Sequence, residues 1–583
     1  MLFKFPRLLA KISFDSSIYF FGVISLSFLF FEVVFVHAGF FLNQKVAPFT
    51  LPFYFFIYTV SMYLLFYLQR KKEGIQNRLL GLVFFILFAY TMFAIGSSFF
   101  SHTYDTSWDG QGYHSSGIVS FATGWNPIYE KNLPIHLPDA DILVQGYPKA
   151  LWLMQSTLYT AMGSLDGAKV LNLALLIIAT TLLYSFFRRL KIHPFLSLCI
   201  ALLMSIQSHV VIQFFSFMED GIMYEILLCA IALLGICMTE LTYASIIGAF
   251  ASIVLLMGVK YTALPLAGIL GILFLGLCIY KLYRNKLTLD ENATAFFSLL
   301  LISGILFLWV PYFTNLTFFH YVFYPTNFSE IRGMPLHDNF PKNIDSNNKL
   351  ELVFYGIFSK SQTDASSNST SPQNVAQLKI PFTFSKNEIL DSTETYNNRV
   401  GAGGPLFSGI LILSIVTELL LFLLVIKKER KYIYVSLGLF LTVILTVFIS
   451  PTPNLLRYST QVLLIPFIAV LSAILLGKKV KAFYALVTLI LLSLSINAIL
   501  FSFPVFSERN QTMQDITEQL DIMQHSNLVY DVDARRFYSN YIRLAEHKIP
   551  FRVVSSLQCK TQQVLLYTSY TTTFCAEERN ITN

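Results

Sequence analysis

Charged residues are scarce in this chain: they make up 13% of its 583 residues, while hydrophobic residues make up 55%. A soluble domain of this size needs more charge to cover its water-facing surface, so a soluble globular protein is excluded. Phenylalanine, in contrast, is abundant, with 56 copies. We therefore predict an all-α polytopic membrane protein, to which a small outward C-terminal α/β domain is attached.

Cysteine is also sparse, and four of the six copies lie inside apolar runs, where they act as small hydrophobes. Cys559 and Cys575 lie near the C-terminus and can pair only in an oxidising compartment. His102, His114 and His136 lack zincin spacing and have no thiol nearby, so neither a metal site nor another cofactor is expected. No basic stripe is interleaved with aromatics, so nucleic acid is not an expected partner.

Apolar runs of about 17–25 residues are long enough to cross a bilayer, and we count thirteen of them. In lipid these runs must be helices, because every backbone polar group needs an internal partner. The run at 149–163 is shorter and is predicted to lie in the interface or to re-enter the membrane. The thirteen runs are 17–37, 49–68, 79–99, 166–187, 195–217, 221–239, 243–259, 261–281, 293–312, 404–426, 431–449, 455–476 and 481–503.

Basic residues set the expected orientation, because they concentrate in cytoplasmic loops. With the N-terminus cytoplasmic, all six basic groups fall inside, whereas the short outer turns carry only Lys45, Lys260 and Arg457. The C-terminus is then outside. The six groups are Lys4, Arg7 and Lys11; Arg70, Lys71, Lys72 and Arg78; Arg188, Arg189 and Lys191; Lys281, Arg284 and Lys286; Lys427, Lys428, Arg430 and Lys431; and Lys478, Lys479 and Lys481.

The chain divides into five segments. They are two N-terminal spans (1–78), a transmembrane core with a first outward loop at 100–150 (79–312), a second outward loop rich in Asn, Ser and Thr (313–403), four further spans (404–503), and an extracytoplasmic α/β domain (504–583). The middle of the second loop is too polar to fold alone. In the last segment the pattern predicts helices at 509–524 and 534–547, with strands at 527–532, 551–555 and 564–569.

The first outward loop carries Asp105 and Asp109, which face the same way if the segment is helical. A carboxylate beside an apolar wall suits a general base that acts on a hydroxyl. Alternatively, both aspartates belong to solvated turns, since Asp109-Gly110 is also a turn signal. Trp108, with its aromatic neighbours, is typical of an interfacial belt and is also suited to stacking on a sugar.

Other charged residues at the outer edge are further candidates. Glu219 and Asp220 join two spans, either as a second source of carboxylate or as an ordinary loop. Arg457 lies at the start of the predicted span 455–476, a position suited to gripping a phosphate. Lys260 and Lys149 either assist it or only extend toward the interface.

Two adjacent stretches carry a family resemblance: residues 104–130 (YDTSWDGQGYHSSGIVSFATGWNPIYE) and residues 146–190 (GYPKALWLMQSTLYTAMGSLDGAKVLNLALLIIATTLLYSFFRRL). The order of an acidic loop, a proline-led short helix, a small-residue turn and a span ending in Arg188-Arg189 resembles the GT-C glycosyltransferases. The nearest branches are protein O-mannosyltransferase-like and aminoarabinose-transferase-like. The resemblance covers residues 79–280 and extends beyond them only in layout, including an Arg-Tyr pair before a late helix.

The resemblance implies an inverting, metal-independent transfer of a sugar from a polyprenyl-phosphate carrier to a hydroxyl of an extracytoplasmic glycan, lipid or protein. Asp109 matches the catalytic aspartate, and Tyr113 and His114 follow it in the substrate site. The chain departs from the family where Gly110 replaces a second acid, and two extra helices precede the loop. An O-antigen polymerase or ligase and a transporter or flippase are the alternatives. The expected location is a bacterial inner membrane.

Overall fold

A computed structural model describes residues 13–69, 74–135, 141–284, 291–325, 343–344, 348–363, 375–386, 388–389, 398–401, 403–449, 455–476, 480–526, 528–534, 537–559, 562–565 and 572–577. Among these residues, nine helices are long and apolar enough to cross a membrane. This confirms a largely helical chain of the multi-pass membrane type. The long helices include α2 (Phe14–Phe41), α3 (Thr50–Leu68), α4 (Ile75–Ser98), α8 (Val170–Arg189), α11 (Asp220–Thr239), α13 (Leu264–Tyr283), α14 (Glu291–Leu308) and α20 (Lys481–His525).

Shorter apolar helices occupy other predicted spans, including α12 (Tyr243–Val259). In the predicted span 455–476 only α19 (Ile465–Leu476) is α-helical, and two 3-10 helices, η8 (Leu456–Tyr458) and η9 (Thr460–Leu464), precede it. The stretch 195–217, predicted as one span, is divided into α9 (Pro194–Ser205) and α10 (Ser208–Ile212). Gln207 between them has extended backbone angles, which stop the helical hydrogen bonding. The prediction of a single continuous span at this place was therefore wrong.

Helix α18 (Phe407–Val447) consists of two arms that fold back on each other. The hydroxyl of Ser436 donates to the carboxylate of Glu418 at 3.1 Å. In a straight helix two residues eighteen positions apart would be about 27 Å from each other, so this hydrogen bond requires the chain to turn back between them. The two arms correspond to the predicted spans 404–426 and 431–449.

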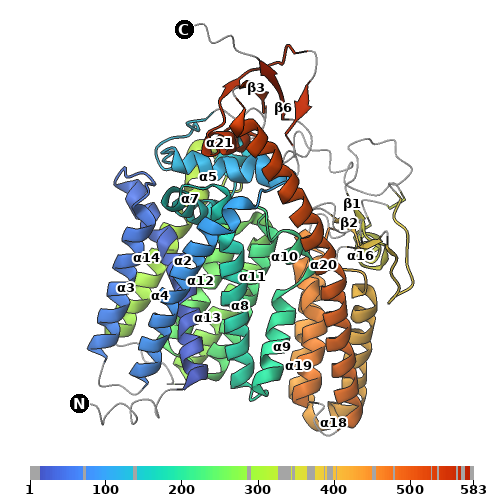
Figure 1. Cartoon of the computed structure of the whole chain (residues 1–583). Coiled ribbons are helices and arrows are strands. Elements are labelled where there is room, and N and C mark those ends of the chain that lie inside the picture. The colour runs from blue at the N-terminus through green and yellow to red at the C-terminus, as the bar shows by residue number, and fades with distance from the viewer. Residues whose placement is uncertain are drawn as a thin grey trace, which may run out of the picture.

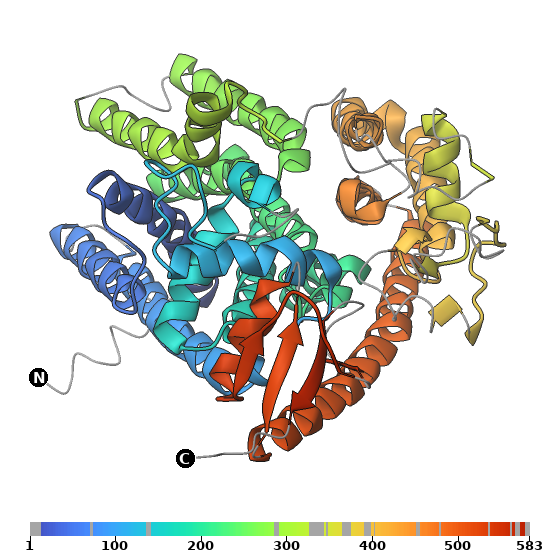
Figure 2. The same ribbon diagram turned by 90° about the horizontal axis from the view of Figure 1, so that it is seen from above.

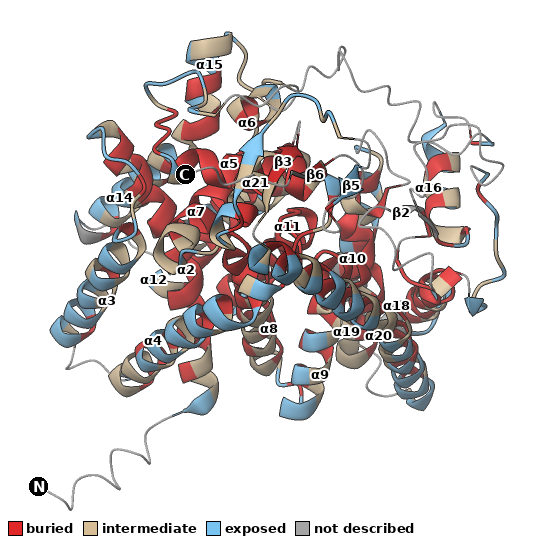
Figure 3. Ribbon diagram, turned by 45° about the horizontal axis from the view of Figure 1, so that its top comes forward, coloured by how far each residue is buried: buried red, intermediate tan, exposed pale blue. Residues whose placement is uncertain are grey.

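The centre of the bundle is formed by α2, α8, α11 and α12, whereas α3 and α13 lie at its edge. In the apolar window of α11, 83% of the residues are buried, against 11% in α3. Figure 3 shows the same contrast between buried central helices and exposed outer faces. Helix α2, predicted as an added N-terminal span, is thus a core helix that packs against α4, α8 and α12. The exposed apolar faces of the outer helices are suited to contact with lipid.

The first outward loop forms helices at one end of the bundle. They are the π-helix η3 (Gly110–His114), α5 (Ser115–Ala122), α6 (Asp141–Gly146) and α7 (Ala150–Met162). Figures 1 and 2 show α5 lying across the bundle rather than along it. The predicted interfacial run 149–163 is α7, whose thirteen residues are too few to cross a bilayer. His136 lies outside the described residues.

The C-terminal region, meaning the described part of residues 504–583, lies at the same end of the bundle as α5 and α7 (Figure 1). Helix α20 continues without a break from the predicted span through the predicted helix 509–524, with Pro504 inside it. Beyond it, β3 (Val529–Asp533), α21 (Tyr538–Glu546), β4 (Phe551–Val553), β5 (Gln563–Val564) and β6 (Thr573–Glu577) follow. The strands form a sheet in the order β4-β3-β6-β5, in which β3 and β4 are parallel. Cys559 and Cys575 form a disulfide.

Much of the second outward loop, 313–403, including 364–374, lies outside the described residues. Its described part includes α15 (Thr314–Phe319), α16 (Lys349–Phe358) and a small sheet of β1 (Gln362–Thr363) and β2 (Asn398–Val400).

Candidate functional site

The site is built around an ion pair between the first outward loop and a late segment of the chain. Arg457, in the 3-10 helix η8 (Leu456–Tyr458), places Nη1 3.0 Å from Oδ2 of Asp109. The two side chains are 14% and 19% exposed, so the pair is accessible from outside the protein interior. Asp109 stands at the start of η3 but does not cap it. Its carboxylate is thus available for the cation and for a ligand.

Asp105 has a different role from Asp109, although only four residues separate them. Its side chain is fully buried, and its two oxygens accept hydrogen bonds from the backbone N–H groups of Ser107 and Phe217, both at 2.7 Å. Burial raises the pKa of this carboxyl, and the nearby charge of Lys169 opposes the shift. Asp105 therefore makes a turn contact with Ser107, as the alternative interpretation expected, but the turn is buried rather than solvated, and the carboxylate also joins the loop to the segment before α11.

Gly110 occupies the position where the GT-C resemblance leads one to expect a second acid. A Cβ atom at this glycine would meet Oδ2 of Asp105 at 1.9 Å and the Ser107 hydroxyl at 2.3 Å. The carboxylate of Asp105 thus fills the space that a side chain at position 110 would need. A side chain at position 110 would therefore require Asp105 and Ser107 to move.

Asp220 and Lys260 form a second ion pair, at 2.5 Å and almost fully buried. Asp220 begins α11 and also accepts a hydrogen bond from the amide of Gln213 at 3.2 Å. Lys260 follows α12; burial lowers its pKa, but the charge of Asp220 outweighs this effect, so the net shift is upward. Both carboxylate oxygens of Asp220 are engaged, which makes it a partner for Lys260 rather than a free base.

Tyr458 links the two ion pairs. The Nζ atom of Lys260 lies 4.9 Å from the centre of its ring, and the guanidinium of Arg457 lies 4.7 Å from it. Cations over an aromatic ring are attracted by its quadrupole. Two cations are therefore held close to one ring, which is suited to a doubly charged or extended anion.

Glu219 is the other carboxylate next to this site. It is 1% exposed, and neither of its oxygens has a hydrogen-bond partner among the described residues. Oε1 lies 3.5 Å from Nδ1 of His114, and that nitrogen accepts a hydrogen bond from the indole N–H of Trp152 at 3.0 Å. Because an unpaired buried carboxylate is costly, Glu219 is suited to a ligand that donates hydrogen bonds.

Tyr113 connects this acid to the first ion pair. Its ring lies 4.2 Å from the ring of His114 and 5.8 Å from that of Tyr147. Burial raises the pKa of Tyr113, and the charges of Asp109 and Glu219 add to the shift. The hydroxyl therefore stays protonated and serves as a hydrogen-bond donor or acceptor.

Lys149 and Trp108 lie at the margins of the site. Lys149 is fully buried, and its Nζ donates to the backbone oxygens of Gln145 and Tyr147, both at 2.7 Å. It thus closes the turn before α7, and burial holds its pKa well below the usual range. Trp108 is 39% exposed, with its ring edge-on to Phe537 at 6.3 Å.

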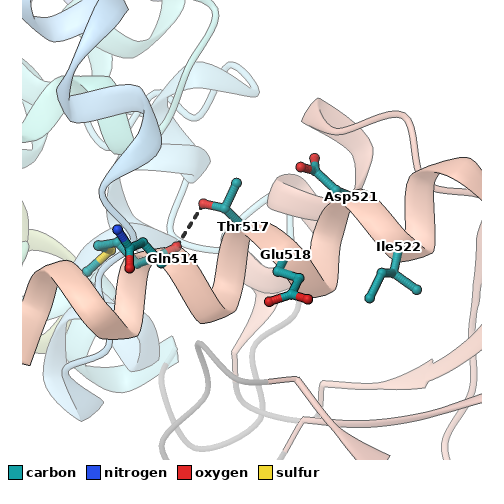
Figure 4. A pocket seen from close by; sticks show the side chains of 6 residues that line it. Gln514, Thr517, Glu518, Asp521 and Ile522 are labelled. Carbon is teal, nitrogen blue, oxygen red and sulfur yellow. Dashed lines mark hydrogen bonds between the residues drawn. The ribbon is translucent and has the colours of Figure 1, made fainter.

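Sequence reasoning missed Trp152, which is one aromatic residue in an aromatic-rich chain, and noted Tyr458 only as the second member of the Arg-Tyr pair, without a role of its own. Within the described part of the chain, no group of three His, Cys, Asp or Glu residues is arranged to hold a metal ion. A shallow pocket of about 440 Å³ on α20 is lined by Met513, Gln514, Thr517, Glu518, Asp521 and Ile522 (Figure 4). All of these residues come from one helix, and none belongs to the site.

No protein family model, curated protein or solved structure matches this chain. The chemistry of the site thus rests on its own geometry.

Proposed function

We propose that the protein is an integral-membrane glycosyltransferase that moves a sugar from a polyprenyl-phosphate carrier to an acceptor hydroxyl outside the cytoplasm. The observation that carries this proposal is the partly exposed pair of Asp109 and Arg457: a candidate base and a phosphate-binding fork in one site. The donor phosphate would bind Arg457, which can hold it through two hydrogen bonds. Lys260, beside the same tyrosine, would add a second positive charge.

The reaction needs one proton transfer and one displacement. Asp109 takes the proton of the acceptor hydroxyl, and the oxygen attacks the anomeric carbon from the side opposite the phosphate. The bond between that carbon and the phosphate oxygen breaks, and its electron pair leaves with the polyprenyl phosphate. Arg457 stabilises the charge of this leaving group, and the anomeric configuration inverts. No resident metal or cofactor is part of the proposal.

Glu219, His114 and Tyr113 would bind the sugar. The unpaired carboxylate of Glu219 accepts hydrogen bonds, which sugar hydroxyl or amino groups donate. Trp108 offers an exposed ring at the edge of the site for the acceptor or the sugar face. Asp105 and Lys149 hold the walls of the site and do not contact the substrates.

The proposal places the site on the extracytoplasmic side of a bacterial inner membrane, with a cytoplasmic N-terminus. It counts α9 and α10, interrupted at Gln207, together as one of thirteen membrane crossings. At the opposite end of the bundle, Arg188 pairs with Asp15 at 2.9 Å. The support for this orientation is the concentration of basic residues at that end. The described basic residues expected inside are Arg78, Arg188, Arg189, Lys191, Lys281, Arg284 and Lys481. The side chains of the remaining members of the six groups lie outside the described residues.

The test is release of polyprenyl phosphate from a panel of radiolabelled undecaprenyl-phosphate sugars, with purified protein in lipid nanodiscs and a panel of hydroxyl-bearing glycan, lipid and peptide acceptors. Asp109→Asn should abolish release, and Arg457→Gln should weaken donor binding and slow release. Asp515→Asn, at an exposed position on α20, is the matched control and should retain full activity. Full activity in Asp109→Asn would refute the assignment. Loss of activity only in Arg457→Gln would favour the polymerase or ligase alternative.

A further inference from the structure

The C-terminal region makes direct contacts on both sides of Asp109. From α20, Arg509 donates to the hydroxyl of Thr106 at 2.9 Å, and the sulfur of Met513 accepts the backbone N–H of Tyr104 at 2.9 Å. The side chain of Tyr104 is 1% exposed and packs into the apolar cluster of the C-terminal region, beside Met513, Ile516 and Leu520. The first outward loop thus contributes a residue to the core of the C-terminal region.

A buried charge cluster lies beneath this contact. Arg543 of α21 is fully buried, and its Nε and Nη2 atoms donate to the two oxygens of Asp166 at 2.6 and 3.0 Å. Asp166 also accepts a hydrogen bond from Lys169 at 2.7 Å, and at 3.3 Å from the backbone N–H of Asp105. One carboxylate therefore joins the C-terminal region, the start of α8 and the loop.

Two further contacts reach the far side of the loop. The hydroxyl of Ser539 donates to the backbone oxygen of Gln111 at 3.3 Å. Phe537 packs against Trp108 and lies 3.6 Å from the Cβ position of Gly112. Asp109 thus stands between residues that are held from α20 on one side and from α21 on the other.

We infer that the C-terminal region is a clamp for the candidate catalytic loop, and that Arg543 is a positioning residue for Asp109. The fork of Arg543 fixes Asp166, Asp166 fixes the backbone at Asp105, and Asp105 leads into η3 at Asp109. A loop with few other contacts would sample many conformations, and each contact with a rigid element removes some of them. The inference rests on the proposed function only where it calls the loop catalytic.

The test uses the full-length protein in nanodiscs and measures amide hydrogen exchange in the peptide covering residues 103–114. Arg543→Gln removes the fork from a buried carboxylate, so exchange there should rise by about tenfold or more. Arg543→Lys keeps the charge without the fork and should give a smaller rise. Arg552→Gln is the matched control, because Arg552 pairs with Asp531 at 2.7 Å in the same region but at an exposed position. It should leave residues 103–114 unchanged.

Kinetics separate this inference from the proposed function. Arg543→Gln should lower the kcat for polyprenyl phosphate release about tenfold and leave the KM for the donor nearly unchanged, because Arg457 is intact. Unchanged amide exchange in residues 103–114 would refute the inference that the C-terminal region holds this loop in place. Unchanged kcat in a variant with a loosened loop would overturn the positioning role and leave Asp109 as the base. If Arg543→Gln does not fold, Arg543→Lys and Arg509→Gln decide the question by the same two measurements.

Discussion

Arg457 and Asp109 are 348 positions apart in the chain, yet their side chains meet at 3.0 Å. Asp109 directly precedes η3, which leads into α5, and Figure 1 shows α5 at the same end of the bundle as the C-terminal region. In the absence of a donor, Asp109, the proposed base, and Arg457, the proposed phosphate ligand, form an ion pair with each other. A phosphate that binds Arg457 must compete with Asp109, and its binding releases the carboxylate for the acceptor.

This competition predicts that Asp109→Asn tightens phosphate binding while it abolishes transfer. Removing the carboxylate removes the competitor, and the gain should be about threefold to tenfold, since the pair is partly exposed to solvent. The measurement is binding of undecaprenyl phosphate to nanodisc-embedded protein. Asp515→Asn should bind as wild type does. Weaker binding in Asp109→Asn would show that the aspartate does not compete with the lipid phosphate.

The buried pair of Asp220 and Lys260 should be more important for stability than the partly exposed pair of Asp109 and Arg457. Asp220→Asn leaves the Lys260 ammonium buried without its counter-charge, a change that costs about 3–5 kcal/mol. The melting temperature in detergent should fall by several degrees. The double variant Asp220→Asn/Lys260→Met should recover much of the loss. A double variant no more stable than Asp220→Asn would show that the unpaired charge is not the cause.

Gly110→Ala should destabilise the loop even though it adds only one methyl group. The new Cβ atom would overlap the Asp105 carboxylate, and overpacking of this kind costs about 1–3 kcal/mol. We expect faster amide exchange in residues 103–114 and slower release of polyprenyl phosphate. Gly163→Ala is a useful comparison, since no atom lies within 4 Å of its Cβ position, although its positive φ adds a modest backbone cost. Equal effects of the two changes would argue against the steric explanation.

Glu546 should make docking of the C-terminal region depend on pH. Burial raises the pKa of its carboxyl from 4.5 to about 7, and the charge of Asp166 adds to the shift. The backbone N–H of Leu165, the charge of Arg543 and the hydroxyl of Tyr159 act in the opposite direction. The docked state therefore binds the proton more tightly than the undocked state does. The contribution of Glu546 to the stability of the docked state is fully present below about pH 4.5 and is lost as the pH rises through about 7.

The measurement is the amide exchange of the C-terminal region between pH 4.5 and 8, corrected for the intrinsic rate. Glu546→Gln should remove the part of the pH dependence that this carboxyl causes. His547, whose pKa is lowered by burial, is present in both proteins, so the difference between them isolates Glu546. An identical pH profile in the variant would contradict the assignment.

The sequence predicted more of the fold than of the site. Apolar runs predicted the long helices because bilayer thickness fixes their length, and the break at Gln207 was missed because a short polar interruption leaves the average hydropathy high. Local pattern could not separate the two aspartates of the loop, because both fit a turn and both fit a base; only the family resemblance ranked Asp109 ahead of Asp105. Their roles depend on which groups the fold brings to them, namely the N–H of Phe217 and the fork of Arg457.

Composition and apolar run length alone determined that this is a multi-pass helical membrane protein, because burial in lipid is a property of each segment by itself. Tertiary structure decided that Asp109 meets Arg457, that Asp105 excludes a side chain at Gly110, and that Arg543 reaches Asp166. Each of these contacts joins side chains through packing of several helices, and local sequence carries no record of such packing.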